Sequence, residues 1–204
     1  MNVRDEPAHW PVVSTAELVR GRLVTLRTDK VRMPDGELAE RDVVIHPGAV
    51  AVLALDDTQQ VLVIRQYRHP VGRLLWEIPA GLRDVSGEPP WATARRELLE
   101  EAGYRARDWR VLADYYTSPG FSTERLRVFL ARDLEFVPEG ERDFVPEGEE
   151  TQLVPAWLPL DEAVRKVFAG ELHNGVAALA ILAGYAARSE GYKRLRPADA
   201  PEEQ

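Results

Sequence analysis

Residues 81–104 constrain the fold more than any other part of this 204-residue chain. After Pro89-Pro90, which the first turn of a helix tolerates, apolar residues recur with helical spacing as far as Ala102. Gly103 follows directly, and glycine is the residue that most often caps the C-terminal end of a helix. The sequence therefore predicts one helix that begins just after the prolines and ends at Gly103.

Three glutamates of this predicted helix share one face, because Glu97, Glu100 and Glu101 stand at positions i, i+3 and i+4. Like charges this close repel one another and destabilise the helix unless a cation lies among them. Carboxylates at this density, with no His or Cys nearby, suit a hard cation such as Mg²⁺ or Mn²⁺. Arg96 can pair with Glu100 and hold its side chain in place.

The loop before the helix offers a further ligand, because Gly81 lets the backbone come close to a metal and the Ala80 carbonyl can then bind it. The alternative is a solvated, charged helix face stabilised by ordinary ion pairs, which is the commoner meaning of an isolated E-x-x-E-E. Here six positions are fixed at once, and by average residue usage they match by chance about once in 10⁷ starting points. These positions are Glu88, Arg96, Glu97, Glu100, Glu101 and Gly103.

The same residues resemble the Nudix box, G-x5-E-x7-R-E-U-x-E-E-x-G-U, in which U is a bulky apolar residue. From Glu88 to Tyr104 the match is complete. One departure lies upstream, where six residues rather than five separate Gly81 from Glu88. An extra loop residue leaves the spacing of the carboxylates intact, but it changes the expected placement of the Gly81 backbone.

Three flanking segments resemble the ADP-ribose pyrophosphatase branch of that family: V-I-R-Q-Y-R-H-P at 63–70, W-E-I-P-A-G at 76–81 and S-P-G-F-S at 118–122. The likeness covers about residues 43–190, and the N-terminal residues more weakly. It implies Mg²⁺-dependent hydrolysis of ADP-ribose to AMP and ribose 5-phosphate, with Mn²⁺ as an alternative metal. Another NDP-sugar or nucleotide as substrate remains open. A non-catalytic sensor of ADP-ribose also remains open, although such modules often lose box carboxylates that this chain keeps.

The resemblance and the residue chemistry together give a candidate site. The metal ligands are Ala80, Glu97, Glu100 and Glu101. The catalytic candidates are Arg96, Glu100 and a loop glutamate as general base, with Glu149 or Glu150 first and Glu147 next. The substrate-binding candidates are Arg68, Glu77, Pro119 and Gly120, of which Arg68 would contact phosphate. An eight-residue repeat over 136–151 creates rival bases at Glu139 and Glu141.

Together the segments predict an α+β fold, a Nudix-like α/β/α sandwich with a mixed sheet, plus a small N-terminal antiparallel sheet. We divide the chain into an N-terminal arm and sheet at 1–46, a hydrolase domain at 47–190 and a polar tail at 191–204. Within the domain, 49–55 and 61–66 read as a hairpin, and 161–169 and 176–188 as helices. The N-terminal sheet and the apolar last helix favour a homodimer.

The amino-acid composition limits the classes of partner and of chemistry that the chain can have. The formal net charge is −8, so nucleic acid is disfavoured as the main partner, whereas a small nucleoside diphosphate sugar neutralised by a metal is not. The chain has no cysteine, which excludes disulfides and thiolate chemistry. The longest near-apolar run, 176–187, is too short for a membrane span, and residues 1–7 lack a signal core. The expected compartment is the cytoplasm.

Overall fold

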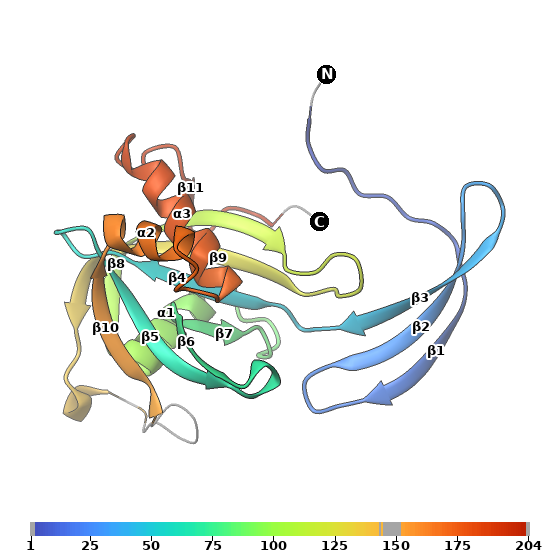
Figure 1. Cartoon of the computed structure of the whole chain (residues 1–204), viewed down its shortest axis with the longest axis horizontal. Coiled ribbons are helices and arrows are strands. Elements are labelled where there is room, and N and C mark those ends of the chain that lie inside the picture. The colour runs from blue at the N-terminus through green and yellow to red at the C-terminus, as the bar shows by residue number, and fades with distance from the viewer. Residues whose placement is uncertain (1–2, 143, 145–151, 203–204) are drawn as a thin grey trace. The chain divides into compact units, whose positions relative to one another are not determined.

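We describe a computed structural model of the chain, which covers residues 3–142, 144 and 152–202 (Figure 1). The chain divides into two compact units, and each is described by itself. Unit 1 contains residues 1–48, 116–125 and 201–204, and unit 2 contains residues 49–115 and 126–200.

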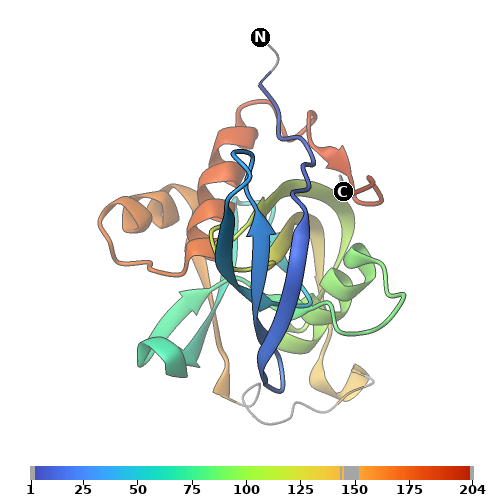
Figure 2. The same cartoon turned by 90° about the vertical axis from the view of Figure 1, so that its right-hand side faces the viewer.

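Unit 1 is built on a three-stranded antiparallel sheet, as predicted (Figure 2). Its strands are β1 (Val12–Arg20), β2 (Thr25–Arg32) and β3 (Leu38–Ile45), in the spatial order β1-β2-β3. Gly36 occupies the turn between β2 and β3 with a φ of 91°, a conformation that glycine adopts without strain. Every residue of β1 is exposed, so this edge strand has little core of its own in the described chain.

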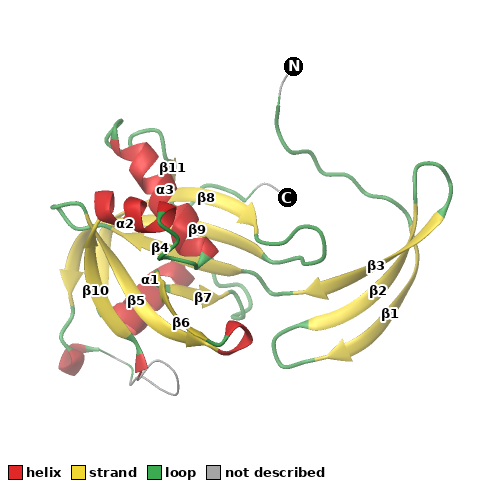
Figure 3. Ribbon diagram, viewed as in Figure 1, coloured by secondary structure: helices red, strands yellow, loops and turns green. Residues whose placement is uncertain are grey.

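The described part of unit 2 contains two sheets and three helices (Figure 3). The five-stranded sheet has the order β11-β8-β9-β4-β7, and the three-stranded sheet has the order β10-β5-β6. The strands are β4 (Ala49–Ala54), β5 (Gln60–Arg68), β6 (Arg73–Glu77), β7 (Ala80–Leu82), β8 (Tyr104–Tyr116), β9 (Arg125–Phe136), β10 (Val154–Pro159) and β11 (Arg196–Pro197). The helices are α1 (Pro90–Ala102), α2 (Leu160–Phe168) and α3 (Gly175–Arg188), with short 3₁₀ turns at His69–Val71 and Glu139–Glu141. Because β4 runs parallel to β9 and antiparallel to β7, the larger sheet is mixed, as predicted.

The prediction of a hairpin over 49–66 is wrong. The two strands touch only at one antiparallel bridge, between Leu55 and Val61, and then enter different sheets. The reason is that β4 is buried along its whole length, so both of its faces and both of its edges are used by other elements.

The sandwich has a core on each side of β4. Side chains that alternate along β4 face opposite clusters, with Leu53 among the residues that pack on α2 and α3 and Val52 among those that pack on α1. Gly184 of α3 makes this packing close, since a β-carbon there would collide with Leu53. The α/β/α arrangement predicted from the sequence is thus confirmed in unit 2, with α1 on one face and the other two helices on the opposite face.

The helices form where the sequence offers end signals. The side chain of Asn174 accepts a hydrogen bond from the backbone N–H of Ala177 at 2.9 Å and so begins α3. Gly103, with a φ of 74°, ends α1 by donating its backbone N–H to the Leu99 carbonyl at 2.9 Å, as predicted. Across the described residues, no helix combines the length and the apolar character that crossing a lipid bilayer requires.

Candidate active site

The predicted carboxylates lie on α1. This helix buries Thr93, Ala94, Leu98 and Ala102 in the core. Two of its glutamates, Glu97 and Glu101, lie against β7. Its first turn is fixed by Glu88, whose carboxylate accepts a hydrogen bond from the Thr93 hydroxyl at 2.8 Å. The sequence motif contained Glu88, but the prediction gave it no contact; the buried Thr93 five residues later is the signal that was missed.

Glu101 is partly buried against β7. Its Oε2 accepts the backbone N–H of Ala80 at 2.8 Å, which joins α1 to β7. Burial raises the pKa of Glu101 to about 8. The hydrogen bond from Ala80 and the charge of Arg68 act in the opposite direction, while the like charges of Glu97 and Glu77 raise the pKa further.

Arg96 holds three acidic groups of the motif. Its Nη1 lies 2.8 Å from Glu97 Oε1 and 2.8 Å from Glu100 Oε2, and its Nη2 lies 3.5 Å from Glu88 Oε2. Burial acts to lower the pKa of Arg96, but the charges of Glu97 and Glu100 outweigh it and keep the pKa above its ordinary value. The predicted pairing with Glu100 is present, and Arg96 orients Glu97 and Glu88 as well.

The lack of a side chain at Gly81 leaves room for the Glu97 carboxylate. A β-carbon built on Gly81 would overlap the Glu97 side chain at its carboxylate end. Glycine is therefore required on β7 for steric reasons, because the strand passes against that carboxylate. The extra residue between Gly81 and Glu88 has not moved Gly81 away from the motif helix.

Arg68 and Glu77 form an ion pair across the β5–β6 hairpin. Arg68 Nε donates to Glu77 Oε1 at 2.9 Å and its Nη2 to Glu77 Oε2 at 2.7 Å, which is the two-point geometry of a guanidinium on a carboxylate. Glu77 is only 3% exposed. Both charges act on the pKa of Glu101, so the pair borders the carboxylates of α1. Sequence reasoning named both residues but missed that they bind each other.

The donor set suits a hard divalent cation. In the described part of the chain, no three acidic or histidine side chains stand as a ready-formed metal site; protein donors hold the carboxylates instead. The chemistry nonetheless fits, because Glu101 is buried beside the like charges of Glu97 and Glu77, and a cation would relieve that repulsion. The residues that could hold it are Glu97, Glu100, Glu101 and the Ala80 carbonyl.

The other predicted site residues are not among the contacts of unit 2 described so far. Pro119 and Gly120 lie in the 116–125 loop of unit 1, which is bonded to β3: the Val44 N–H donates to the Phe121 carbonyl at 2.7 Å, and the Thr123 N–H donates to the Val44 carbonyl at 3.0 Å. The candidate bases Glu147, Glu149 and Glu150 lie outside the described residues. Their rivals Glu139 and Glu141 occupy an exposed 3₁₀ turn.

Comparison with known proteins adds independent information. Residues 45–179 match the model of the NUDIX domain, and residues 10–44 match that of the nucleoside diphosphate sugar hydrolase N-terminal domain. An ADP-ribose pyrophosphatase of Mycobacterium tuberculosis is 46% identical over 93% of this chain and 89% of its own. An ADP-ribose pyrophosphatase of Bacillus subtilis is 37% identical over 83% of this chain and 89% of its own. A crystal structure of an ADP compounds hydrolase shares the fold, with a TM-score of 0.75 at 21% identity, over 92% of this chain and 99% of that one.

Proposed function

This chain belongs to the Nudix family of hydrolases, and from that membership we propose that it hydrolyses the diphosphate bond of ADP-ribose to give AMP and ribose 5-phosphate. The observation that carries the reaction class is the gathering of Glu97, Glu100 and Glu101 on α1 against Ala80. The choice of ADP-ribose is supported by the two relatives with that activity, which match most of this chain.

We propose Mg²⁺ as the cofactor, with Mn²⁺ as an alternative, held by Glu97, Glu100, Glu101 and the Ala80 carbonyl. When bound, such a cation would neutralise the charge of the diphosphate and lower the pKa of a water molecule. Arg96 keeps Glu97 and Glu100 in position at 2.8 Å each, so the carboxylates are oriented before substrate arrives.

The remaining roles concern substrate and proton transfer. Arg68, oriented by Glu77 through its Nε and Nη2, is proposed to contact phosphate as a fixed positive charge, because a guanidinium keeps its charge and carries five N–H donors. Pro119 and Gly120 are proposed to bind the rest of the nucleotide sugar. The general base is proposed to be Glu149 or Glu150, with Glu147 as the next choice, since a base must take the proton of the attacking water.

A second candidate is hydrolysis of another nucleoside diphosphate sugar. The match of residues 10–44 supports it, because the matched N-terminal domain is named for nucleoside diphosphate sugars in general. A sensor that binds ADP-ribose without cleaving it is less well supported, since the box carboxylates are all present.

The test is to incubate the full chain with ADP-ribose and Mg²⁺ and to follow AMP and ribose 5-phosphate by chromatography. A parallel reaction with EDTA is the control. We expect AMP release with Mg²⁺ and none with EDTA. Faster cleavage of a different NDP-sugar would favour the second candidate. Binding without cleavage, measured by calorimetry, would favour the sensor.

A further inference from the structure

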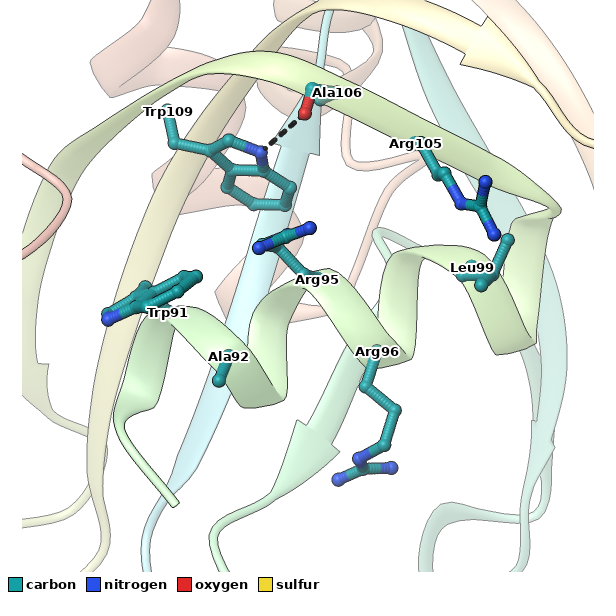
Figure 4. Close-up of a pocket in the computed structure, with 8 residues that line it drawn as sticks. All are labelled: Trp91, Ala92, Arg95, Arg96, Leu99, Arg105, Ala106 and Trp109. Atoms are coloured by element: carbon teal, nitrogen blue, oxygen red, sulfur yellow. Dashed lines mark hydrogen bonds between the residues drawn. The ribbon is translucent and has the colours of Figure 1, made fainter. Parts of the chain in front are cut away.

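A cavity lies between the start of β8 and the side of α1 that carries Trp91 and Arg95 (Figure 4). Its volume is about 510 Å³, within the range of pockets that bind small molecules. The lining residues are Trp91, Ala92, Arg95, Arg96, Leu99, Arg105, Ala106 and Trp109. All of them belong to unit 2, and of these only Arg96 is part of the candidate active site.

The cavity is locally cationic. Three arginines line it and no carboxylate does, in a chain whose net charge is −8. Arg96 points away from the two indoles and is engaged by Glu97 and Glu100. Arg95 and Arg105 are exposed, and neither has an ion-pair partner within the described ranges. Two guanidinium groups are thus available to an anion.

The cavity also presents flat aromatic surface. The Arg95 guanidinium lies 5.4 Å from the centre of the Trp91 ring, a cation–π contact. Trp109 is held in place, because its indole N–H donates to the Ala106 carbonyl at 3.0 Å and its ring meets Phe129 edge to face at 6.2 Å. A partly buried indole of fixed orientation beside free cationic groups suits a ligand that is both aromatic and anionic.

We propose that this cavity binds a mononucleotide, with the base against the indole of Trp109 and the phosphate on Arg105 and on Arg95, which lies over the Trp91 ring. A mononucleotide combines the two chemistries that the lining offers, a flat ring and a dianionic phosphate. The site does not depend on the proposed hydrolysis, because it uses a different face of α1.

The test uses the full chain in EDTA, with ¹⁵N-labelled tryptophan, and follows the indole N–H signals by NMR. Three probes separate the two chemistries: AMP, adenosine without the phosphate, and ribose 5-phosphate without the base. We expect AMP to shift the signals of Trp91 and Trp109. Each partial probe should bind about tenfold more weakly or worse, because it loses either the charge-assisted contacts or the stacking. Equal affinities for all three, or shifts confined to other tryptophans, would overturn the proposal.

Variants of the exposed arginines supply the second arm. Arg95→Gln and Arg105→Gln should each raise the Kd for AMP about tenfold, the loss expected for a charge-assisted contact. Arg107→Gln is the matched control, because Arg107 lies on the same strand but pairs with Asp133 and Glu135 outside the cavity. Unchanged AMP affinity in the Arg95→Gln/Arg105→Gln double variant would refute the site. That outcome is independent of whether ADP-ribose is cleaved, which the chromatographic assay measures.

Discussion

Glu97 and Glu101 lie one turn apart on α1, yet the protein holds them in different ways. Glu97 takes the guanidinium of Arg96, whereas Glu101 takes the backbone N–H of Ala80 from inside the protein. A buried carboxylate beside like charges destabilises the fold, and such groups cluster at functional sites, which makes Glu101 a candidate functional residue.

If both carboxylates bind the metal, Glu97→Gln and Glu101→Gln should each lower kcat at least about 100-fold, because a neutral amide is a poor ligand for a hard cation. Glu101→Gln should not lower the unfolding midpoint, since it removes a charge that burial opposes. Steady-state kinetics and thermal unfolding measure both effects. Glu190→Gln is the control, because Glu190 pairs with Arg194 just beyond the end of α3 and is not a candidate site residue. Turnover near the unmodified rate in either site variant would remove that residue from the metal site.

Gly81 permits a test that leaves every charge unchanged. Gly81→Ala should displace the Glu97 carboxylate, lower kcat about tenfold or more, and cost about 1–3 kcal/mol of folding stability through overpacking. Gly140→Ala, where a β-carbon meets nothing within 4 Å, should change neither quantity. Equal behaviour of the two variants would mean that the close approach of β7 to Glu97 has no functional value.

At the scale of elements, the end of the chain is tied into the larger sheet. β11 pairs with β8. Arg127, only 2% exposed in its side chain, donates from Nε and Nη2 to the two carboxylate oxygens of Asp114 at 2.7 and 2.9 Å and from Nη1 to the Ala200 carbonyl at 2.6 Å. Arg196 adds a second contact to Asp114 at 2.8 Å. One carboxylate thus joins β8, β9 and β11.

This cluster predicts a pH dependence of stability. Burial acts to raise the pKa of Asp114, but hydrogen bonds from Arg127 and Arg196 outweigh it, so the pKa lies below its ordinary value. Its stabilising contribution is therefore present above the pKa of the unfolded chain, about 3.9, and is lost as the pH falls below that value. Asp114→Asn should cost about 3 kcal/mol at pH 7, because it leaves Arg127 buried without its charge partner.

Urea unfolding at a series of pH values measures both the stability cost of Asp114→Asn and its dependence on pH. The gap in unfolding free energy between the unmodified chain and Asp114→Asn should stay constant from pH 7 to about pH 5 and narrow as the pH falls through about 3.9 towards the lower pKa of the folded chain. Asp57→Asn, an exposed position in the β4–β5 turn, should show no gap at any pH. A gap that is constant with pH would show that the Asp114 carboxylate is not the titrating group.

Whether a feature of the fold or site could be predicted from the sequence depends on how far apart along the chain the interacting residues lie. The helix α1, its end at Gly103 and the shared face of its glutamates depend on spacings of a few residues, and they were predicted. The pairing of β4 with β9 joins residues 77 positions apart, and no local pattern specifies it. The pair of Arg68 and Glu77 required the register of a hairpin, and the cluster at Asp114 required the fold itself.

At the scale of the whole molecule, unit 1 leaves several large apolar side chains exposed, most of them on β1. They are Val12, Val13, Leu18 and Val19 of β1, Leu23 of the β1–β2 turn and Leu38 of β3, each between 46% and 60% exposed. Monomeric proteins seldom expose apolar side chains in such density, and β1 is also an edge strand of its sheet. We therefore propose that a second copy of the chain covers these side chains.

Light scattering at micromolar concentration should then give twice the chain mass of 23.0 kDa. Leu18→Glu should halve the measured mass, because it places a charge in the covered surface. Phe168→Glu, at a 78% exposed side chain at the end of α2, should leave the mass unchanged. A monomeric mass for the unmodified chain would contradict the proposed homodimer.

The burial of β4 has a consequence for exchange with solvent. All six of its residues are buried, and the strand is hydrogen-bonded to β9 on one edge and to β7 on the other. Its amide hydrogens can meet deuterium only when the sandwich opens as a whole, so the rates at residues such as Val52 report the global opening equilibrium of unit 2. The exposed strand β1 should exchange by local fraying and report on its own sheet alone. One deuterium-exchange experiment therefore reports the global opening of unit 2 and the local fraying of the unit 1 sheet separately.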